Sequence, residues 1–453
     1  MASEHEQRDP GRVVDASATK ELFIEMITRD IALVPSIVDL VDNCADGARR
    51  MRGNASYQGL AARLDISASE FRLSDNCGGM SVDLARNVAF RFGRPPNTPP
   101  LKHSIGQFGV GMKRAIFKIG KYFRVESTTA SSRFVIEQDV VAWAKIPEWE
   151  YEFRELEEDG RFNSTQQGTT ITITELHDGV AAEFALQDFV PQLKQEIKSR
   201  LRDPIARKLA ITINAIPVDS EPLTLLASKE LAPAYKELRF SATGAKPVTV
   251  RLFCGLGDSE DPDAAGWHVF CNGRLILEGD KTPATGWSAE IDDVSLPAFH
   301  GQYNHLRGYA YFDCDDPGRL PWNTTKTGFN MDSSVYRAAR LEMMKMALPV
   351  KTFLDRLKEE KSAKAKAGSD EPGPLQSLLL SARPGDIHKI DTRPTFDLPT
   401  AKAKKVTGPI MQKIQYDEPL KRVQEVRSAL KARSWKEVGE KTFEYFYKAE
   451  VGE

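Results

Sequence analysis

The stretch Asp39-Leu40-Val41-Asp42-Asn43-Cys44-Ala45-Asp46 decides how this chain of 453 residues is interpreted. It lies in a segment, residues 36–51, whose pattern predicts a helix, and Pro35 opens that helix at a position where proline is well tolerated. Asp39 and Asn43 are four residues apart and therefore share one helix face. The pair supplies a candidate metal ligand, whereas Asp42 is expected to point elsewhere on the helix.

Two more stretches follow in order. Asp75-Asn76-Cys77-Gly78-Gly79-Met80 places an aspartate in a tight, glycine-rich turn after a strand-like alternation at residues 63–73. Gly106-Gln107-Phe108-Gly109-Val110-Gly111-Met112-Lys113 is a glycine-rich loop that runs into a predicted helix, where backbone N–H groups can hold phosphate. A metal ligand, a base reader and a phosphate cradle together describe a nucleotide site.

The order of these three stretches resembles that of the GHKL ATPase superfamily, which includes gyrase B, the MutL mismatch-repair proteins, the ninety-kilodalton heat-shock chaperones, the MORC proteins and the histidine kinases. One glycine-rich motif alone would be weak evidence, but three motifs in order are specific. The resemblance covers residues 20–180 and, more loosely, residues 180–350. It implies an α+β chain with a Bergerat-fold α/β sandwich ATPase domain, a transducer-like α+β domain and a helical C-terminal tail.

The expected domain organisation follows from the resemblance and from the composition. Asn272-Gly273-Arg274 is similar to a hairpin in the second domain of MutL, MORC and chaperone relatives, and Asn-Gly is a turn signal in its own right. The predicted parts are a disordered N-terminus (1–17), an ATP-binding domain (18–185), a transducer-like domain (186–361), and a linker with short C-terminal helices (362–453).

The resemblance gives Asp39 and Asn43 their expected roles. Asp39 stands where most ATP-hydrolysing relatives have the glutamate that activates the attacking water. Aspartate is one methylene shorter, so this base would lie roughly an ångström further back, and such a displacement lowers rates strongly. Asn43 would hold Mg²⁺, which would bridge the phosphates. The alternative is a helix with two polar residues on its solvent face.

The second motif is expected to read adenine. Asp75 should accept a hydrogen bond from the exocyclic amine, which selects adenine over guanine. The family pattern is Asp-x-Gly-x-Gly, and here Cys77 stands at the first glycine while Gly79 matches. Met80 would pack against the base, unless it is only a core residue. Thr169, in a Gly-Thr that opens a predicted strand, would hydrogen-bond near the adenine pocket or be an ordinary strand threonine.

The phosphate end is expected to combine backbone groups with cations. Residues 81–105 would form the ATP lid, and Lys113 would place a cation near the phosphates or be a solvated lysine. The complete predicted nucleotide-binding set is Asn43, Asp46, Asp75, Gly79, Met80, Gly106, Gly109, Val110, Gly111, Lys113 and Thr169, in which Asp46 chiefly fixes local structure.

Lys326 is the predicted catalytic residue outside the nucleotide domain. It lies in Pro321-Trp322-Asn323-Thr324-Thr325-Lys326-Thr327, which resembles the loop by which the transducer domain of gyrase B and MutL relatives sends a lysine to the γ-phosphate. A cation there would stabilise charge that develops in the transition state. The alternative is a surface loop lysine.

Composition and charge set the remaining limits. The net charge of −2 gives no global basic field for nucleic acid, although the basic stretch at 194–208 could touch DNA or be a solvated helix face. No apolar run is long enough to span a bilayer, and the first residues lack the apolar core of a signal peptide. Five cysteines, an odd number at irregular spacings, indicate a reduced, cytoplasmic protein. The sequence has no Cys-x-x-Cys and no pair of histidines at metal spacing, so no structural zinc site is expected.

The resemblance implies an ATP-dependent conformational switch with slow hydrolysis and ATP-dependent homodimerisation. The likeness to MORC and MutL proteins favours a DNA-related or genome-defence process with DNA or a DNA-processing protein as partner, and no membrane. Two alternatives stay open: a chaperone-like ATPase that acts on protein clients, and a non-hydrolysing, ATP-sensing scaffold. Asp39 and Cys77 suggest the scaffold.

Overall fold

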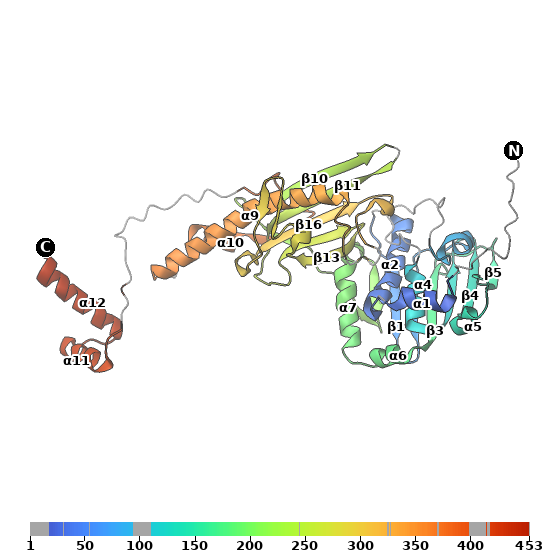
Figure 1. Cartoon of the computed structure of the whole chain (residues 1–453), viewed down its shortest axis with the longest axis horizontal. Helices are drawn as coiled ribbons and strands as arrows, with labels where there is room; N and C mark the ends of the chain where they lie inside the picture. The colour runs from blue at the N-terminus through green and yellow to red at the C-terminus, as the bar shows by residue number, and fades with distance from the viewer. Residues whose placement is uncertain are drawn as a thin grey trace, which may run out of the picture. The chain divides into compact units, whose positions relative to one another are not determined.

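The structure is a computed structural model that describes residues 18–29, 31–53, 55–93, 110–243, 245–323, 326, 328–368, 371–397, 414 and 417–452. The chain splits into two compact units: Met1–Leu357 with Ser377–Thr400, and Lys358–Gln376 with Ala401–Glu453. Figure 1 shows the helices and strands in order along the chain, from blue at the N-terminus to red at the C-terminus. Gly106, Gly109 and the predicted disordered N-terminus lie outside the described residues. The predicted domain boundary between residues 185 and 186 lies inside the first unit and stays a prediction.

The first unit contains an eight-stranded mixed sheet with the order β5-β4-β3-β6-β2-β1-β7-β8. All neighbours are antiparallel except β1 and β7, which run parallel. The register places Asp75, the last residue of β2, opposite Thr169 of β6. The strands are β1 (Ala61–Ile66), β2 (Phe71–Asp75), β3 (Gly120–Thr128), β4 (Arg133–Asp139), β5 (Phe153–Glu157), β6 (Gly168–Leu176), β7 (Ala210–Ile213) and β8 (Ile216–Pro217).

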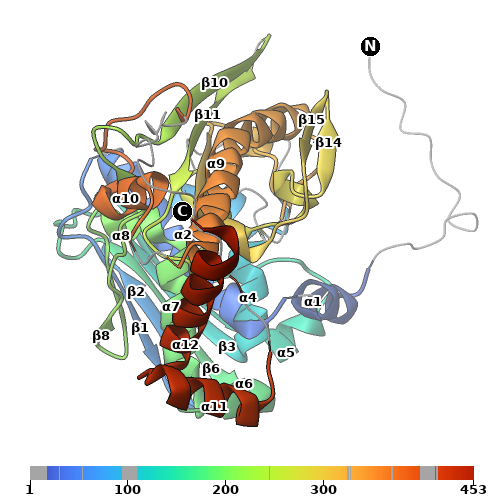
Figure 2. The same ribbon diagram turned by 90° about the vertical axis from the view of Figure 1, so that its left-hand side faces the viewer.

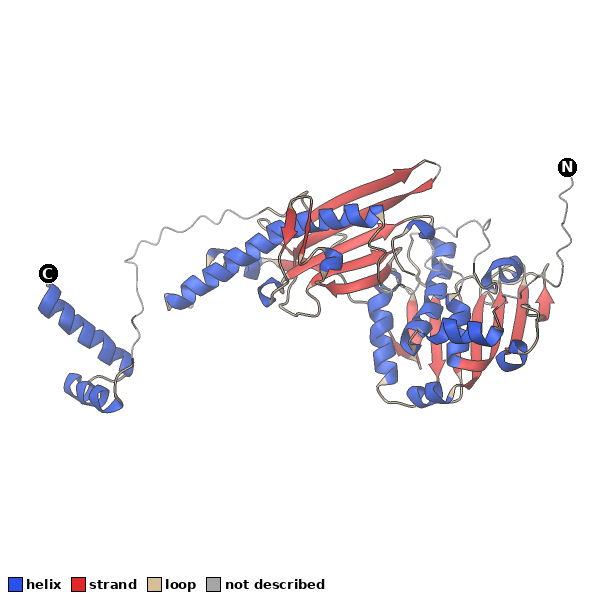
Figure 3. Ribbon diagram, in the orientation of Figure 1, coloured by secondary structure: helices blue, strands red, loops and turns tan. Residues whose placement is uncertain are grey.

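Helices cover one face of this sheet (Figure 3). The central helix is α2 (Leu33–Arg52), which is apolar on several of its sides. Its residues Ile37, Val38, Leu40 and Val41 are all fully buried. Burial on several sides fixes the position of the polar residues between them. The other helices here are α1 (Lys20–Arg29), α3 (Val82–Leu84), η2 (Ala85–Ala89), α4 (Gly111–Ile119), α5 (Val140–Ala144), α6 (Asp178–Phe184), α7 (Phe189–Arg200) and α8 (Arg202–Ala206).

A second, five-stranded sheet has the order β10-β11-β16-β12-β13. Only β12 and β16 are parallel, and β10 and β11 project as a long pair (Figure 2). Aromatic stacking of Phe270 on Tyr311, with ring centroids 4.7 Å apart, lies in its core. The strands are β10 (Ala234–Ala242), β11 (Ala245–Leu256), β12 (Gly266–Cys271), β13 (Arg274–Asp280) and β16 (Leu306–Asp313).

The long helix α9 (Ser334–Lys366) packs on this sheet through Tyr336, whose ring lies 5.8 Å from that of Phe312. The two sheets with their helices confirm the predicted α+β class. Smaller elements are β9 (Thr224–Ala227), which pairs with β17 (Arg383–Asp386), β14 (Ala289–Ile291), which pairs with β15 (Val294–Leu296), and the 3-10 turns η3 (Pro283–Thr285), η4 (Gly301–Tyr303) and η5 (Pro317–Arg319).

Short helices characterise the C-terminal part of the chain, as the sequence predicts. Ser434 begins α12 by accepting a hydrogen bond from the backbone N–H of Glu437, a typical N-cap. In the part of the chain that the structure describes, no helix is both long and apolar enough to cross a membrane. The helices are α10 (Pro374–Ser381), α11 (Leu420–Leu430), α12 (Trp435–Phe446) and η6 (Tyr447–Val451).

Candidate functional site

The first part of the site is a pair of carboxylates on α2. Asp39 and Asp42 are both buried, whereas Asn43, one turn after Asp39, is exposed. Residues three apart on a helix are neighbours, so the two carboxylates can share a partner. The expectation that Asp42 points elsewhere is wrong, because both carboxylates contact the ammonium of Lys326.

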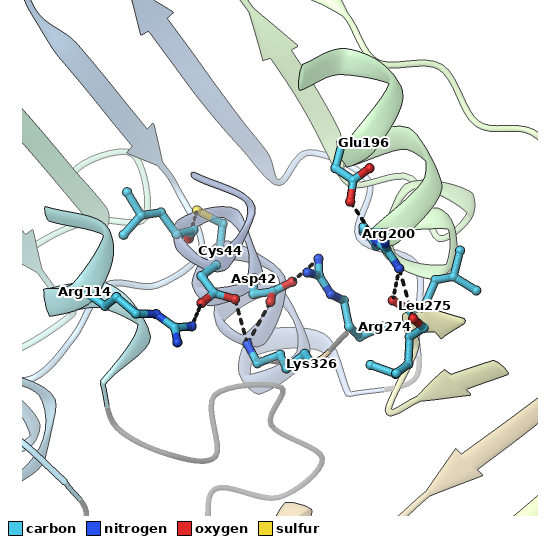
Figure 4. A network of polar contacts seen from close by, with 11 residues as sticks. Asp42, Cys44, Arg114, Glu196, Arg200, Arg274, Leu275 and Lys326 are labelled. Atoms are coloured by element: carbon cyan, nitrogen blue, oxygen red, sulfur yellow. Dashed lines mark hydrogen bonds and ion pairs between the residues drawn. The ribbon is translucent and has the colours of Figure 1, made fainter. Parts of the chain in front are cut away.

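Three cations from distant segments meet these carboxylates (Figure 4). Arg114 Nη2 donates to Asp39 Oδ2 at 2.5 Å. Lys326 Nζ lies 3.3 Å from Asp39 Oδ1 and 2.9 Å from Asp42 Oδ2. Arg274 Nη1 donates to Asp42 Oδ1 at 3.1 Å. Each of the four carboxylate oxygens therefore has one cationic partner, and Lys326 bridges the two carboxylates.

The charges in this network fix its protonation. Burial by itself would raise the pKa of Asp39, but the positive charges of Lys326, Arg274 and Arg114 outweigh it and hold that pKa below its ordinary value. Burial acts to lower the pKa of Lys326, and the two carboxylates reverse this, so its pKa is raised. Burial raises the pKa of Asp42 against the pull of Arg274 and Lys326. At neutral pH Asp39 is ionised and Lys326 is protonated.

Lys326 lies in a short loop that follows β16 in the chain, and its side chain reaches α2. Its φ of 55° lies in the left-handed region, which costs a non-glycine residue free energy and marks a constrained position. The loop is closed by a bridge between Trp322 and Phe329 and by hydrogen bonds from the backbone of Asn323 to Gly328 and of Lys326 to Asn323. The side chain is therefore directed inward, and Lys326 is only 6% exposed.

The predicted Asn-Gly turn determines the position of Arg274, which follows it directly in the chain. Asn272 and Gly273 have φ values of 46° and 82°, as a tight two-residue hairpin requires. The Asn272 side chain donates to the carbonyl of Cys314 at 3.1 Å and accepts from its N–H at 3.0 Å. This double hydrogen bond ties the turn to the residue that follows β16, so the hairpin and the lysine loop share one support.

A second group of polar contacts surrounds Asp75 at the end of β2. Asp75 Oδ1 accepts from the backbone N–H of Cys77 at 2.7 Å, and desolvation raises the pKa of this half-buried carboxyl. Ser127 on β3 connects two further predicted residues, Thr169 and Met80. Its hydroxyl lies 2.8 Å from Thr169 Oγ1 and accepts a hydrogen bond from the Met80 N–H at 2.8 Å. Asp75, Met80 and Thr169 are thus neighbours. Sequence reasoning missed Ser127, because only strand register reveals it.

Cys77 is compatible with the turn that follows Asp75. The left-handed backbone positions are Gly78 and Gly79, with φ values of 85° and 68°, and neither falls on the cysteine. A Cβ at Gly79 would lie 2.1 Å from the carbonyl oxygen of Thr128, so glycine is required there. The missing first glycine of the family pattern therefore leaves the turn intact.

The start of α4 forms the third part of the site. Gly111 begins the helix next to α2, where a Cβ would approach Asp39 Oδ2 at 3.4 Å, and Val110 is its N-terminal neighbour. Lys113 is buried and donates to the carbonyls of Ala89 and Arg91, each at 2.7 Å. Its burial lowers its pKa to about 7. Lys113 thus joins α4 to the described part of the predicted lid, and its contact with phosphate stays a prediction.

The predicted site residues fall into three clusters. Asp39 and Lys326 meet, Asp75 lies with Met80 and Thr169, and Gly111 borders Asp39. Asp46 is buried on α2, one turn past Asp42. Sequence reasoning missed Arg114, Asp42 and Arg274 as members of the charge network. The Asn-Gly-Arg turn was a signal for Arg274, but its partner could not be seen from spacing.

Comparison with known proteins points to one region of the chain. Residues 32–169 match a family model described as "Histidine kinase-, DNA gyrase B-, and HSP90-like ATPase". The matched range contains α2, the turn after Asp75, α4 and Thr169, but it ends before Arg274 and Lys326. No curated protein matches the chain.

Proposed function

We propose that this chain, whose residues 32–169 form an ATPase domain of the GHKL superfamily, is an Mg-ATP-binding and hydrolysing conformational switch. The family match supports ATP binding by this domain. The observation that carries the proposal is the contact of Asp39 with Lys326 across 287 residues. It joins the helix of the nucleotide motif to a loop that follows β16, which is the connection that a switch requires.

The residues present fit Mg-ATP. Among the residues that the structure describes, the charge network holds three cations and two carboxylates, which leaves one positive charge in excess. Within the described residues, the buried Nε atoms of Arg114 and Arg274 have no hydrogen-bond partner. An anion such as a terminal phosphate would balance this charge. Asn43 is exposed one turn from Asp39, where its amide oxygen can ligate magnesium that also takes phosphate and water ligands.

The proposed mechanism gives separate tasks to Asp75, Asn43, Asp39 and Lys326. Asp75 accepts from the adenine amine, beside the hydrogen-bonded Ser127 and Thr169. Asn43 would hold Mg²⁺, which neutralises phosphate charge when it is bound. Asp39 accepts the proton of the attacking water, and Lys326 stabilises the charge that develops on the transferred phosphoryl group. Because the charges of Lys326, Arg274 and Arg114 lower the pKa of Asp39, this carboxylate is a weak base, and we expect slow hydrolysis.

Calorimetry and phosphate release test this function together. We expect the protein to bind ATP more tightly than GTP in the presence of Mg²⁺, and to release phosphate slowly from ATP. Asn43→Ala should abolish the Mg²⁺-dependent turnover, because the metal would lose its amide ligand. Equal affinity for ATP and GTP would contradict the adenine assignment. Binding of ATP without any turnover would instead favour the non-hydrolysing scaffold.

The likeness to MORC and MutL proteins supports, by analogy, a DNA-related or genome-defence process and an ATP-dependent homodimer in the cytoplasm. The basic stretch at 194–208 is a weaker candidate for DNA contact than the sequence indicated, because many of its cations have acidic partners. These pairs are Lys194–Asp219, Lys198–Glu221, Arg200–Glu196, Arg202–Glu278 and Arg207–Asp203. Stimulation of phosphate release by duplex DNA would support this process, and stimulation by unfolded protein would favour the chaperone-like alternative.

A further inference from the structure

We propose that Asp42 is a positioning residue for this reaction: together with Arg274, it sets Lys326 beside Asp39. The inference rests on the proposed function, since it assigns a positioning residue to the same site. Asp42 acts through its partners, because its side chain is only 1% exposed and both of its oxygens are occupied.

The distances indicate that the two carboxylates have different principal partners. Lys326 Nζ lies closer to Asp42, at 2.9 Å, than to Asp39, at 3.3 Å. Asp39 has a shorter contact of its own with Arg114, at 2.5 Å. Asp42 is thus the principal acceptor for Lys326, and Asp39 is its neighbour. Arg274 holds the other oxygen of Asp42 and so orients the carboxylate that receives the lysine.

Burial makes this acceptor necessary. An ammonium in the protein interior needs an opposite charge, and removal of one partner of a buried pair leaves an uncompensated charge that is strongly unfavourable. Without the charge of Asp42, Lys326, Arg274 and Arg114 would face the single carboxylate of Asp39. The repulsion among these cations and the constrained backbone of Lys326 would then favour movement of the lysine out of the site.

Enzyme kinetics provide the first test. Asp42→Asn should lower kcat at least tenfold and leave the affinity for a non-hydrolysable ATP analogue within about twofold. If Asp42 acts through Lys326, the substitution Asp42→Asn should not change kcat in a protein that already carries Lys326→Met. A further loss of kcat in that background would overturn the proposal, because it would show a role independent of the lysine. Asp313→Asn, which breaks the part-buried pair with Arg251, is the matched control and should leave kcat unchanged.

Chemical modification gives a second test that needs no turnover. The rate at which an amine-reactive reagent modifies Lys326, followed by mass spectrometry, should rise at least fivefold in Asp42→Asn. Buried Lys20, which contacts the carbonyl of Trp143, is the internal reference and should react at an unchanged rate. An unchanged rate at Lys326 would overturn the proposal. A wild-type protein that neither binds nor hydrolyses ATP would refute the proposed function, while this measurement would still decide whether Asp42 positions the lysine.

A double variant covers the case in which Asp42→Asn does not fold. Asp42→Asn combined with Arg274→Gln removes one charge of each sign, so the network keeps its excess of one positive charge. We expect this variant to fold and still to expose Lys326 to the reagent. Slow modification of Lys326 in the double variant would also overturn the proposal.

Discussion

The two proposed ends of the candidate site, an adenine end around Asp75 and a phosphate end around Asp39, are built differently. At the adenine end, Asp75, Ser127 and Thr169 lie on adjacent strands, and each contact follows from the register of one sheet. At the phosphate end, the partners of α2 come from 75 to 287 residues away along the chain. The first arrangement depends on hydrogen bonds within one sheet and the turn beside it, and the second depends on the balance of five charges. We therefore expect the adenine end to determine what binds, and the phosphate end to determine what binding causes.

Removal of the proposed base should have the largest effect, and it should change a property of the phosphate end without changing one of the adenine end. Asp39→Asn should lower hydrolysis by about 10³-fold, because it removes the proton acceptor, and should leave the preference for ATP over GTP unchanged. Steady-state phosphate release and calorimetry measure the two properties. Asp39→Glu is the companion variant: a higher rate than wild type would show that the short side chain limits the reaction. A loss of nucleotide preference in Asp39→Asn would contradict the division into two ends.

Lys326→Ala should have the next largest effect. Hydrolysis should fall by about 10²-fold, the size expected for loss of one preorganised cation, while ADP affinity stays the same. Only ATP presents the γ-phosphate, so only ATP affinity should fall, and the difference in limited proteolysis between ADP and a non-hydrolysable ATP analogue should disappear. Persistence of that difference in the variant would show that another group senses the γ-phosphate.

Asp75→Asn tests the adenine end. The amide can present a donor to the adenine amine, so ATP affinity should fall about tenfold, in line with the loss of one hydrogen bond to a charged acceptor. The turnover of bound ATP should change little if the two ends are independent. Single-turnover kinetics at saturating ATP would measure this. A large fall in the rate of the bound state would mean that the adenine contact also sets the chemistry.

The smallest expected effect is the pH dependence of stability at Asp39. Its folded-state pKa is lowered below the ordinary value of 3.8, so its contribution to stability is present above that value and is lost as pH falls through the lower, folded-state pKa. The stability difference between wild type and Asp39→Asn should therefore be largest near neutral pH and shrink as the solution is acidified below 3.8. Urea unfolding at several pH values measures it. A constant difference would show that Arg114 and Lys326 do not stabilise the carboxylate.

The two ends also differ in how far the sequence predicts them. The predicted helix over residues 36–51 is found as α2, Leu33–Arg52, because its apolar residues and its motif are local features. The turn after Asp75 is equally local, since its glycines provide the left-handed positions. The match of residues 32–169 to the ATPase family bears out the resemblance that these motifs carry.

The partners of Asp42 could not be predicted in the same way. Nothing in the spacing of α2 distinguishes an aspartate that faces solvent from one that receives Arg274 from 232 residues away. Lys326 is indicated only by the resemblance of its loop. Nothing in the sequence points to Arg114, because its pairing depends on how α4 packs on α2. Long-range charge pairing is a property of the folded chain, whereas turn chemistry and helix periodicity can be identified in the sequence.

The hairpin at Asn272 and Gly273 is attached to α2 at two places. Arg274 contacts Asp42, and Arg49 donates to the carbonyl of Asn272 at 2.9 Å. Asp42 and Arg49 are separated by about 10 Å along a helix that rises 1.5 Å per residue. Two anchors oppose pivoting about either one, so we expect them to hold the five-stranded sheet against gradual swinging on the helix. We therefore expect a relative movement to release both anchors together, which would make a transition between two arrangements all-or-none rather than graded.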